Sequence, residues 1–248
     1  MTDAAEPNRD EVRALVERLC HLAVELLAHL KEKGAAIREQ AKFGYGKSLE
    51  GHMLLTGAIR SALLRHNGKP GKTSESASKR LLLIASFVQG IDTVETSISE
   101  GFYVQAAALL KQELETIAAL AEVRTGKRQD QKTPNVSAVP WSLGQLYGSL
   151  NEAAHVAEAK VLQAIVGMKQ IGDAVPVAME PIYQKETANN LYSLHVALLA
   201  LLAAELDSLH VDLYGIGLDD GEKRALLISI EFLIADGFLH EPPKGAAA

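Results

Sequence analysis

The sequence contains a single cysteine, Cys20, among its 248 residues. One cysteine cannot form a disulfide within the chain, which is typical of proteins from a reducing compartment. The apolar residues around Cys20 predict that its side chain is buried. Aromatic residues make up only 5% of the sequence, and the β-branched runs that favour strands are scarce. Ala and Leu, which favour helices, dominate instead.

Long apolar runs are also missing. The longest, residues 196–204, is shorter than the roughly 20 residues that span a bilayer. The polar, acidic residues 1–10 do not form a signal peptide. We therefore expect a cytoplasmic protein without a membrane contact. Hydrophobic residues make up 48% of the sequence and charged residues 23%, which is ordinary for a globular protein and provides enough apolar surface for a core.

Apolar residues recur at helical spacing along most of the chain. The segments predicted to be helical are residues 10–33, 49–66, 76–99, 102–124, 141–169, 182–214 and a last helix capped by Asp219 or Asp220 and ending near residue 235. Gly34 is expected to end the first of them. The pattern predicts one all-α domain over residues 1–248, with N-terminal helices in 1–70, a core in 76–169 and C-terminal helices in 182–240.

Two of these segments are separated only by Glu100 and Gly101. Each carries a long apolar stripe, and a short turn between two such stripes favours an antiparallel pair. The sequence therefore predicts a helical bundle built around a long central antiparallel helical hairpin, with arms at residues 76–99 and 102–124.

Polar side chains gather in residues 141–155, within a few turns of a predicted helix. A cleft between this segment and the hairpin would place Tyr147, Asn151 and His155 near Lys111. There His155 could act as general acid or base on the 2′-hydroxyl of RNA. The alternative is that the segment only caps and packs a helix.

Carboxylate–histidine pairs with a spacing of three residues occur twice, as Glu152/His155 and Asp207/His210. This spacing places both side chains on one helical face, as di-metal carboxylate bundles require. Such a site needs two further inward carboxylates, and none of the available glutamates, Glu113 among them, lies clearly in an apolar stripe. The alternative is that both pairs are surface groups, and we expect no cofactor.

Positive charge is concentrated in one part of an acidic chain of net charge −6. Residues 60–80 hold six basic side chains and Glu75 as the only acidic one. This segment could contact RNA or another anion; a solvated loop with helix ends is the alternative. The basic residues are Arg60, Arg65, Lys69, Lys72, Lys79 and Arg80.

Residues 99–115, SEGFYVQAAALLKQELE, and 146–155, LYGSLNEAAH, together with the helix at 76–99, resemble the HEPN superfamily of helical bundles, especially its uncharacterised bacterial branches. The likeness covers about a third of the chain. It implies a helical binding or regulatory protein, in stress or phage defence, that pairs as a homodimer.

Active members of that family are metal-independent ribonucleases with an arginine four to six residues before a histidine. Here the matching positions before His155 are Gly148, Ser149 and Leu150, and Asn151 is one step too close. An arginine at such a position is a fixed positive charge that stabilises phosphate in the transition state. The departure predicts weak or no catalysis. A ribonuclease using His155 and a di-metal bundle remain the two alternatives.

Overall fold

The computed structural model describes residues 9–155 and 179–240. These two ranges contain helices and no strand, which confirms the all-α prediction. The α-helices are α1 (Arg9–Lys42), α2 (Lys47–His66), α3 (Glu75–Ser99), α4 (Tyr103–Arg124), α5 (Tyr147–Ala154), α7 (Lys185–Tyr214) and α8 (Asp220–Ala235), and the short 3₁₀ helices are η1 (Val136–Ala138) and η2 (Pro140–Leu146).

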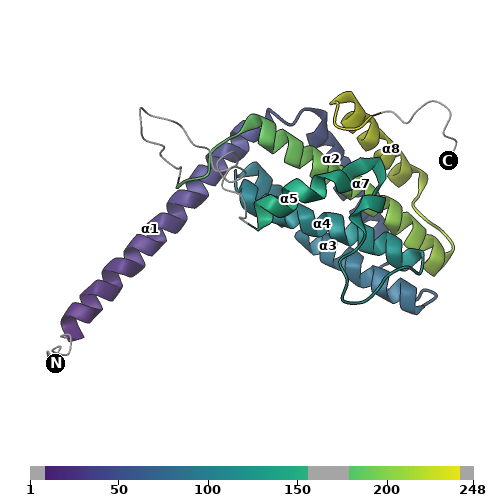
Figure 1. Cartoon of the computed structure of the whole chain (residues 1–248), viewed down its shortest axis with the longest axis horizontal. Coiled ribbons are helices and arrows are strands. Elements are labelled where there is room, and N and C mark those ends of the chain that lie inside the picture. The colour runs from purple at the N-terminus through teal and green to yellow at the C-terminus, as the bar shows by residue number, and fades with distance from the viewer. Residues whose placement is uncertain (1–8, 156–178, 241–248) are drawn as a thin grey trace.

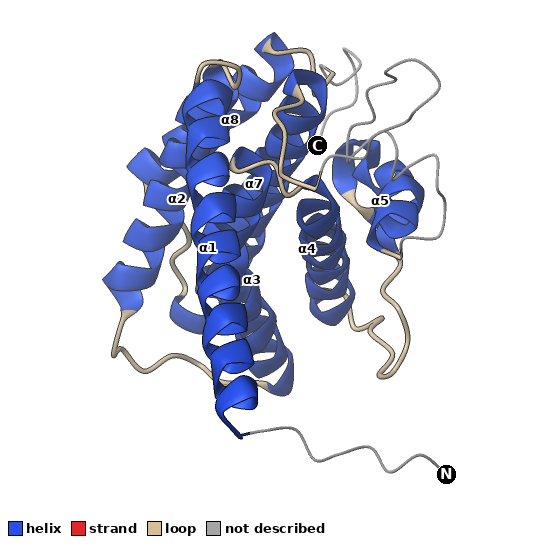
Figure 2. Ribbon diagram, turned by 90° about the vertical axis from the view of Figure 1, so that its left-hand side faces the viewer, coloured by secondary structure: helices blue, strands red, loops and turns tan. Residues whose placement is uncertain are grey.

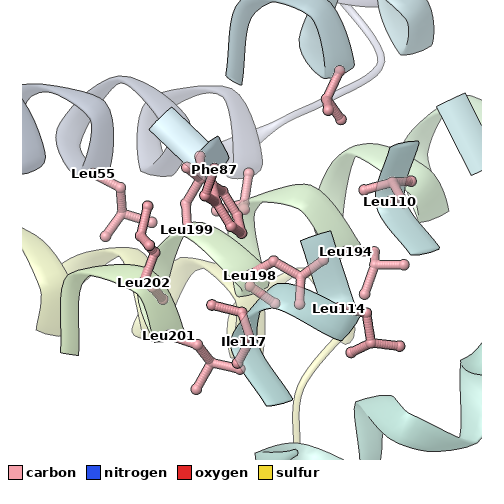
Figure 3. Packing of buried hydrophobic residues seen from close by; sticks show 14 of the residues in the cluster. Leu55, Phe87, Leu110, Leu114, Ile117, Leu194, Leu198, Leu199, Leu201 and Leu202 are labelled. Carbon is pink, nitrogen blue, oxygen red and sulfur yellow. The ribbon is translucent and has the colours of Figure 1, made fainter. Parts of the chain in front are cut away.

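Helix α7 lies at the centre of the bundle, in contact with α2, α3, α4 and α8 (Figure 1). Every side chain from residue 192 to residue 203 is buried. A helix that is apolar on all sides is stable only when other helices surround it. Leu198, Leu199 and Leu202 belong there to one core cluster with Phe87 of α3 and Leu55 of α2 (Figure 3).

The predicted hairpin is formed by α3 and α4. The turn between them depends on Gly101, whose φ of 82° lies in the left-handed region that favours glycine. The Phe102 N–H donates to the Ser97 carbonyl at 2.9 Å and closes the end of α3. The hairpin bounds are within one residue of those predicted, although α7 and not the hairpin occupies the centre.

The prediction that Gly34 ends the first helix is wrong, because α1 continues to Lys42. Gly34 instead permits a close approach to α3, since a Cβ there would lie 2.9 Å from Glu100 Oε2. Arg38 Nη1 then pairs with Glu95 at 2.8 Å and fixes this end of α1. The other end extends away from the bundle (Figure 1), and Cys20, predicted to be buried, is exposed there.

The predicted helix at residues 141–169 begins only at Tyr147. Trp141 and Ser142 each have a φ of 59°, which interrupts the helix and leaves η2 before it. Helix α5 packs against α4 at the edge of the bundle (Figure 2). The remainder of that prediction, residues 156–169, lies outside the described residues.

Among the described helices, α3 and α7 are long and apolar enough to cross a membrane. In the most apolar part of α7, 78% of the residues are buried inside the bundle, and in that of α3 22% are buried. Core helices of helical proteins commonly have this length and hydropathy, and the surroundings of α7 account for its composition.

Candidate functional site

The position of α5 depends on the compact turn that precedes it. Gly144 lies so close to the Val136 carbonyl that a Cβ at this position would overlap it. Leu150 and Ala153 are buried where α5 contacts α4, and Leu143 of η2 is buried as well. Tyr147 and His155 lie at the edge of this contact, where their polar atoms reach side chains of α4.

Four side chains meet where α4 and α5 touch: Lys111, Glu115, Tyr147 and His155, which we call the α4–α5 site. Lys111 Nζ lies 3.4 Å from His155 Nε2 and 3.9 Å from Glu115 Oε1. The Tyr147 hydroxyl donates to Glu115 Oε1 at 2.6 Å. Lys111 Nζ also lies 5.5 Å from the centre of the Tyr147 ring, within range of a cation–π contact.

The hydrogen bonds of the α4–α5 site set its protonation pattern. The hydrogen bond to Glu115, with a contribution from burial, raises the pKa of Tyr147 to about 12. Tyr147 therefore remains a neutral phenol near neutral pH and cannot serve as a base. The Lys111 ammonium can only donate a hydrogen bond, so Nε2 of His155 is the acceptor in this contact.

The structure therefore brings three of the four predicted site residues together, namely Lys111, Tyr147 and His155. Asn151, the fourth, lies one turn before His155 on α5, and its carbonyl accepts the His155 N–H at 3.0 Å. Its side chain is half-buried, whereas His155 is exposed. His155 is thus the exposed member of the α4–α5 site, while the side chains of Lys111 and Glu115 are 18% and 29% exposed.

The two candidate metal pairs lie in different surroundings. Glu152 is exposed on α5, while Asp207 on α7 accepts the Leu218 N–H at 2.6 Å. The His210 ring packs edge-on against His66, 4.6 Å between ring centres. In residues 9–155 and 179–240, no group of three or more His, Cys, Asp or Glu side chains could hold a metal ion.

The sequence interpretation missed a buried polar pair. Glu113 is only 5% exposed, and its Oε2 lies 2.9 Å from Nδ1 of the fully buried His195. Burial raises the pKa of Glu113. The signal was present, because Glu113 follows Leu110 by three residues and precedes Ile117 by four, which is the spacing of the buried face.

The predicted basic segment does not form one continuous patch. Arg80 is 1% exposed and its Nη1 pairs with Asp212 at 2.6 Å. Arg65 pairs with Glu222, and Lys79 pairs with Glu75 at 2.9 Å. These three cations stabilise the fold or are partly neutralised. The other three basic residues, Arg60, Lys69 and Lys72, are exposed and form no ion pair with another residue of ranges 9–155 and 179–240.

No protein-family model, curated protein or solved structure matches the chain.

Proposed function

We propose that this chain is a HEPN-like helical module that binds single-stranded RNA at the α4–α5 site, with weak or no cleavage. The contact between Lys111 and His155, 3.4 Å apart beside the Tyr147 ring, carries the proposal. The resemblance of residues 76–160 adds a regulatory role in stress or phage defence to the proposal.

Each side chain of the α4–α5 site suits one part of an RNA strand. The Lys111 ammonium would neutralise a phosphate, the strongest sequence-independent contact with nucleic acid. The Tyr147 ring, half-buried and held by Glu115, is a rigid surface on which an unpaired base can stack. His155 would donate Nδ1–H to a phosphate or sugar oxygen. This combination is typical of single-strand recognition.

Three features support binding over efficient cleavage. No arginine stands at residues 148–150 to stabilise a phosphorane-like transition state. The α4–α5 site offers one imidazole, whereas cleavage with both a general base and a general acid needs two proton-transfer groups. His155 is also open to water, where electrostatic stabilisation is weak.

The test is fluorescence anisotropy with a labelled single-stranded RNA in excess chelator. Lys111→Ala should weaken binding about five- to tenfold. It should also reduce the slope of log affinity against log salt concentration by about one, the value for one lost phosphate contact. Lys223→Ala is the matched control, because Lys223 is an exposed cation on α8. Equal losses in both variants, or no RNA binding by the native chain, would refute the proposal.

A second candidate function, metal-independent RNA cleavage, is favoured by the same Lys111–His155 contact. The neutral imidazole has its Nε2 lone pair beside a cation, so it could accept the 2′-hydroxyl proton while Lys111 stabilises the phosphate. Incubation of labelled RNA in chelator distinguishes the two functions. Products that disappear in His155→Gln while RNA affinity persists would establish the enzyme; intact RNA would leave only the binding module.

A further inference from the structure

The N-terminal part of α1 carries a continuous apolar face that the described residues leave uncovered. Its large side chains are between 42% and 68% exposed. We call this face the α1 stripe; it consists of Val12, Leu15, Val16, Leu19, Leu22, Leu26 and Leu27. The buried residues of α1 are Gly34, Ile37 and Ala41, all near the other end, where the helix meets α3.

The stripe has the spacing of a coiled-coil seam. Val12, Leu15, Leu19, Leu22 and Leu26 are separated alternately by three and four residues, which is the a/d pattern of a heptad. A helix that only packs on a globular core more often has a broader and less regular face. The regular seam indicates that another helix covers α1.

The exposed area is large enough for a stable pair. With about half of each large side chain exposed, the stripe presents on the order of 700 Å² of apolar surface, more than monomeric proteins usually expose and close to what one partner buries in a standard interface. Residues 9–30 extend over about 30 Å at the rise of an α-helix.

Charge favours a second copy of the chain over a membrane surface. Residues 9–33 contain five acidic and five basic side chains. A helix that binds anionic lipid needs an excess of Lys and Arg on its polar face, which this segment lacks. A neutral helix with both signs interspersed is instead compatible with its own copy.

The flanking positions of the seam select the direction of pairing. Parallel pairs place g residues opposite e residues, and the e positions are Val16, Ala23 and Leu30, which carry no charge. Antiparallel pairs place g residues opposite each other. When Leu19 faces Leu22 of the second copy, the g residues Arg18 and Glu25 lie opposite each other in two symmetric pairs near the middle of the seam, while Glu11 and Glu32 lie opposite each other only at its two ends.

We propose that two copies of this chain associate through their α1 stripes as an antiparallel helical pair, with Arg18 of each helix beside Glu25 of the other. This inference depends on the described part of α1 alone and is independent of RNA binding.

The test is the molar mass of the full chain, measured by light scattering after size exclusion over a micromolar concentration series. The native chain should be a dimer, and Leu19→Glu/Leu22→Glu should be a monomer with an unchanged helical circular dichroism spectrum. Val24→Glu is the matched control, since Val24 is 65% exposed on the same helix but lies outside the seam; it should remain a dimer.

Charge exchange tests the direction of pairing. Arg18→Glu alone should raise the dissociation constant about tenfold, and Arg18→Glu/Glu25→Arg should restore it, because the opposite charges are again adjacent. A monomeric native chain would overturn the proposal. That result would also apply if residues 156–178 or a lipid surface, and not a second copy, covered the α1 stripe. A dimer that survives Leu19→Glu/Leu22→Glu would overturn it as well.

Discussion

Two histidines are held neutral inside the bundle. His52 on α2 is 8% exposed and its ring lies 5.4 Å from that of His195. Burial, and then the nearby His195, lower the pKa of His52 to about 4. Burial, and then the nearby His66, do the same for His210, whose pKa is also about 4. His210 is 3% exposed, so a charged imidazole at either position would lose most of its contact with solvent.

These histidines make stability dependent on pH. In the unfolded chain their pKa is near the ordinary value of about 6.5, so below this pH the unfolded chain takes up protons that the folded chain excludes. Stability is therefore complete above about pH 6.5 and falls as the pH falls towards 4, by up to about 3 kcal/mol per histidine. Urea unfolding near pH 7 and near pH 5 measures the loss.

His52→Phe supplies the control for this prediction, since an aromatic ring of similar size can replace the imidazole beside Tyr192. The variant should lose about half of the pH dependence. A free energy of unfolding equal at both pH values in the native chain would contradict the account.

Arg80 is the most buried cation among the described residues and links three helices. Its Nη1 pairs with Asp212, and its Nη2 donates to the Glu205 carbonyl at 3.1 Å. Glu205 in turn accepts from Arg124 Nε at 3.2 Å. The network fixes α3 and α4 against α7.

Removal of Arg80 leaves the nearly buried Glu205 with Arg124 as its remaining cationic partner and empties a fully buried position between α3 and α7, whereas Asp212, whose side chain is 57% exposed, can be hydrated. Arg80→Ala should lower the free energy of unfolding by about 3–5 kcal/mol, as other broken buried ion pairs do. Lys79→Ala, at the exposed neighbouring position, should cost less than about 1 kcal/mol. Chemical denaturation of both variants measures the difference; similar losses would show that the Arg80 network contributes no more than a surface pair.

At the scale of elements, the turn that leads into α5 controls the α4–α5 site. Gly144→Ala would force its Cβ into the Val136 carbonyl, so η1 and η2 must separate and α5 must move relative to Lys111. We expect a lower melting temperature and RNA affinity reduced about as much as by Lys111→Ala.

Gly148→Ala is the matched substitution, because nothing lies within 4 Å of a Cβ at this position in α5. It should stabilise the helix by up to about 1 kcal/mol and leave RNA affinity unchanged. Thermal unfolding measures the stability of each variant, and fluorescence anisotropy measures its RNA affinity. Equal behaviour of Gly144→Ala and Gly148→Ala would show that the turn does not position the site.

The elements that the sequence predicts well are those with local signals. Glu100 and Gly101 stand between two apolar stripes, and Asp219 caps α8 with a capping box formed with Glu222, so their positions follow from neighbouring residues. The prediction that the first helix ends at Gly34 was wrong because glycine is favoured both at helix ends and where two helices approach closely. The left-handed backbone of Trp141 and Ser142 has no local signal at all.

Tertiary contacts decided what the sequence could not. The contact of Lys111 with His155 requires α5 to pack on α4 in one register, which the spacing of polar residues does not specify. The exposure of Cys20 similarly depends on where α1 leaves the bundle. For Glu113 the sequence did contain a local signal, because its helical spacing indicates burial. The signal was overlooked because a glutamate is rarely buried.

At the scale of the whole molecule, the α1 stripe and the α4–α5 site lie on different elements and could act together. An antiparallel pair would hold two bundles at opposite ends of the paired helices, and one RNA strand could then contact two α4–α5 sites. Dimerisation would raise affinity for long RNA without a new contact.

This arrangement predicts a dependence on RNA length. Leu19→Glu/Leu22→Glu should bind a long RNA at least about tenfold more weakly than the native chain, and a short RNA equally well. Anisotropy with two RNA lengths measures the effect. An equal loss of affinity for both RNA lengths would show that dimerisation does not strengthen the binding of long RNA.

RNA affinity in a double-mutant cycle of Lys111 and His155 tests the central claim most directly. If both side chains contact the same stretch of RNA, Lys111→Ala and His155→Ala each weaken binding, and the double variant loses less than the two losses combined, with a coupling of about 0.5–3 kcal/mol. Additive losses, or affinity unchanged by either substitution, would contradict an RNA-binding site between α4 and α5.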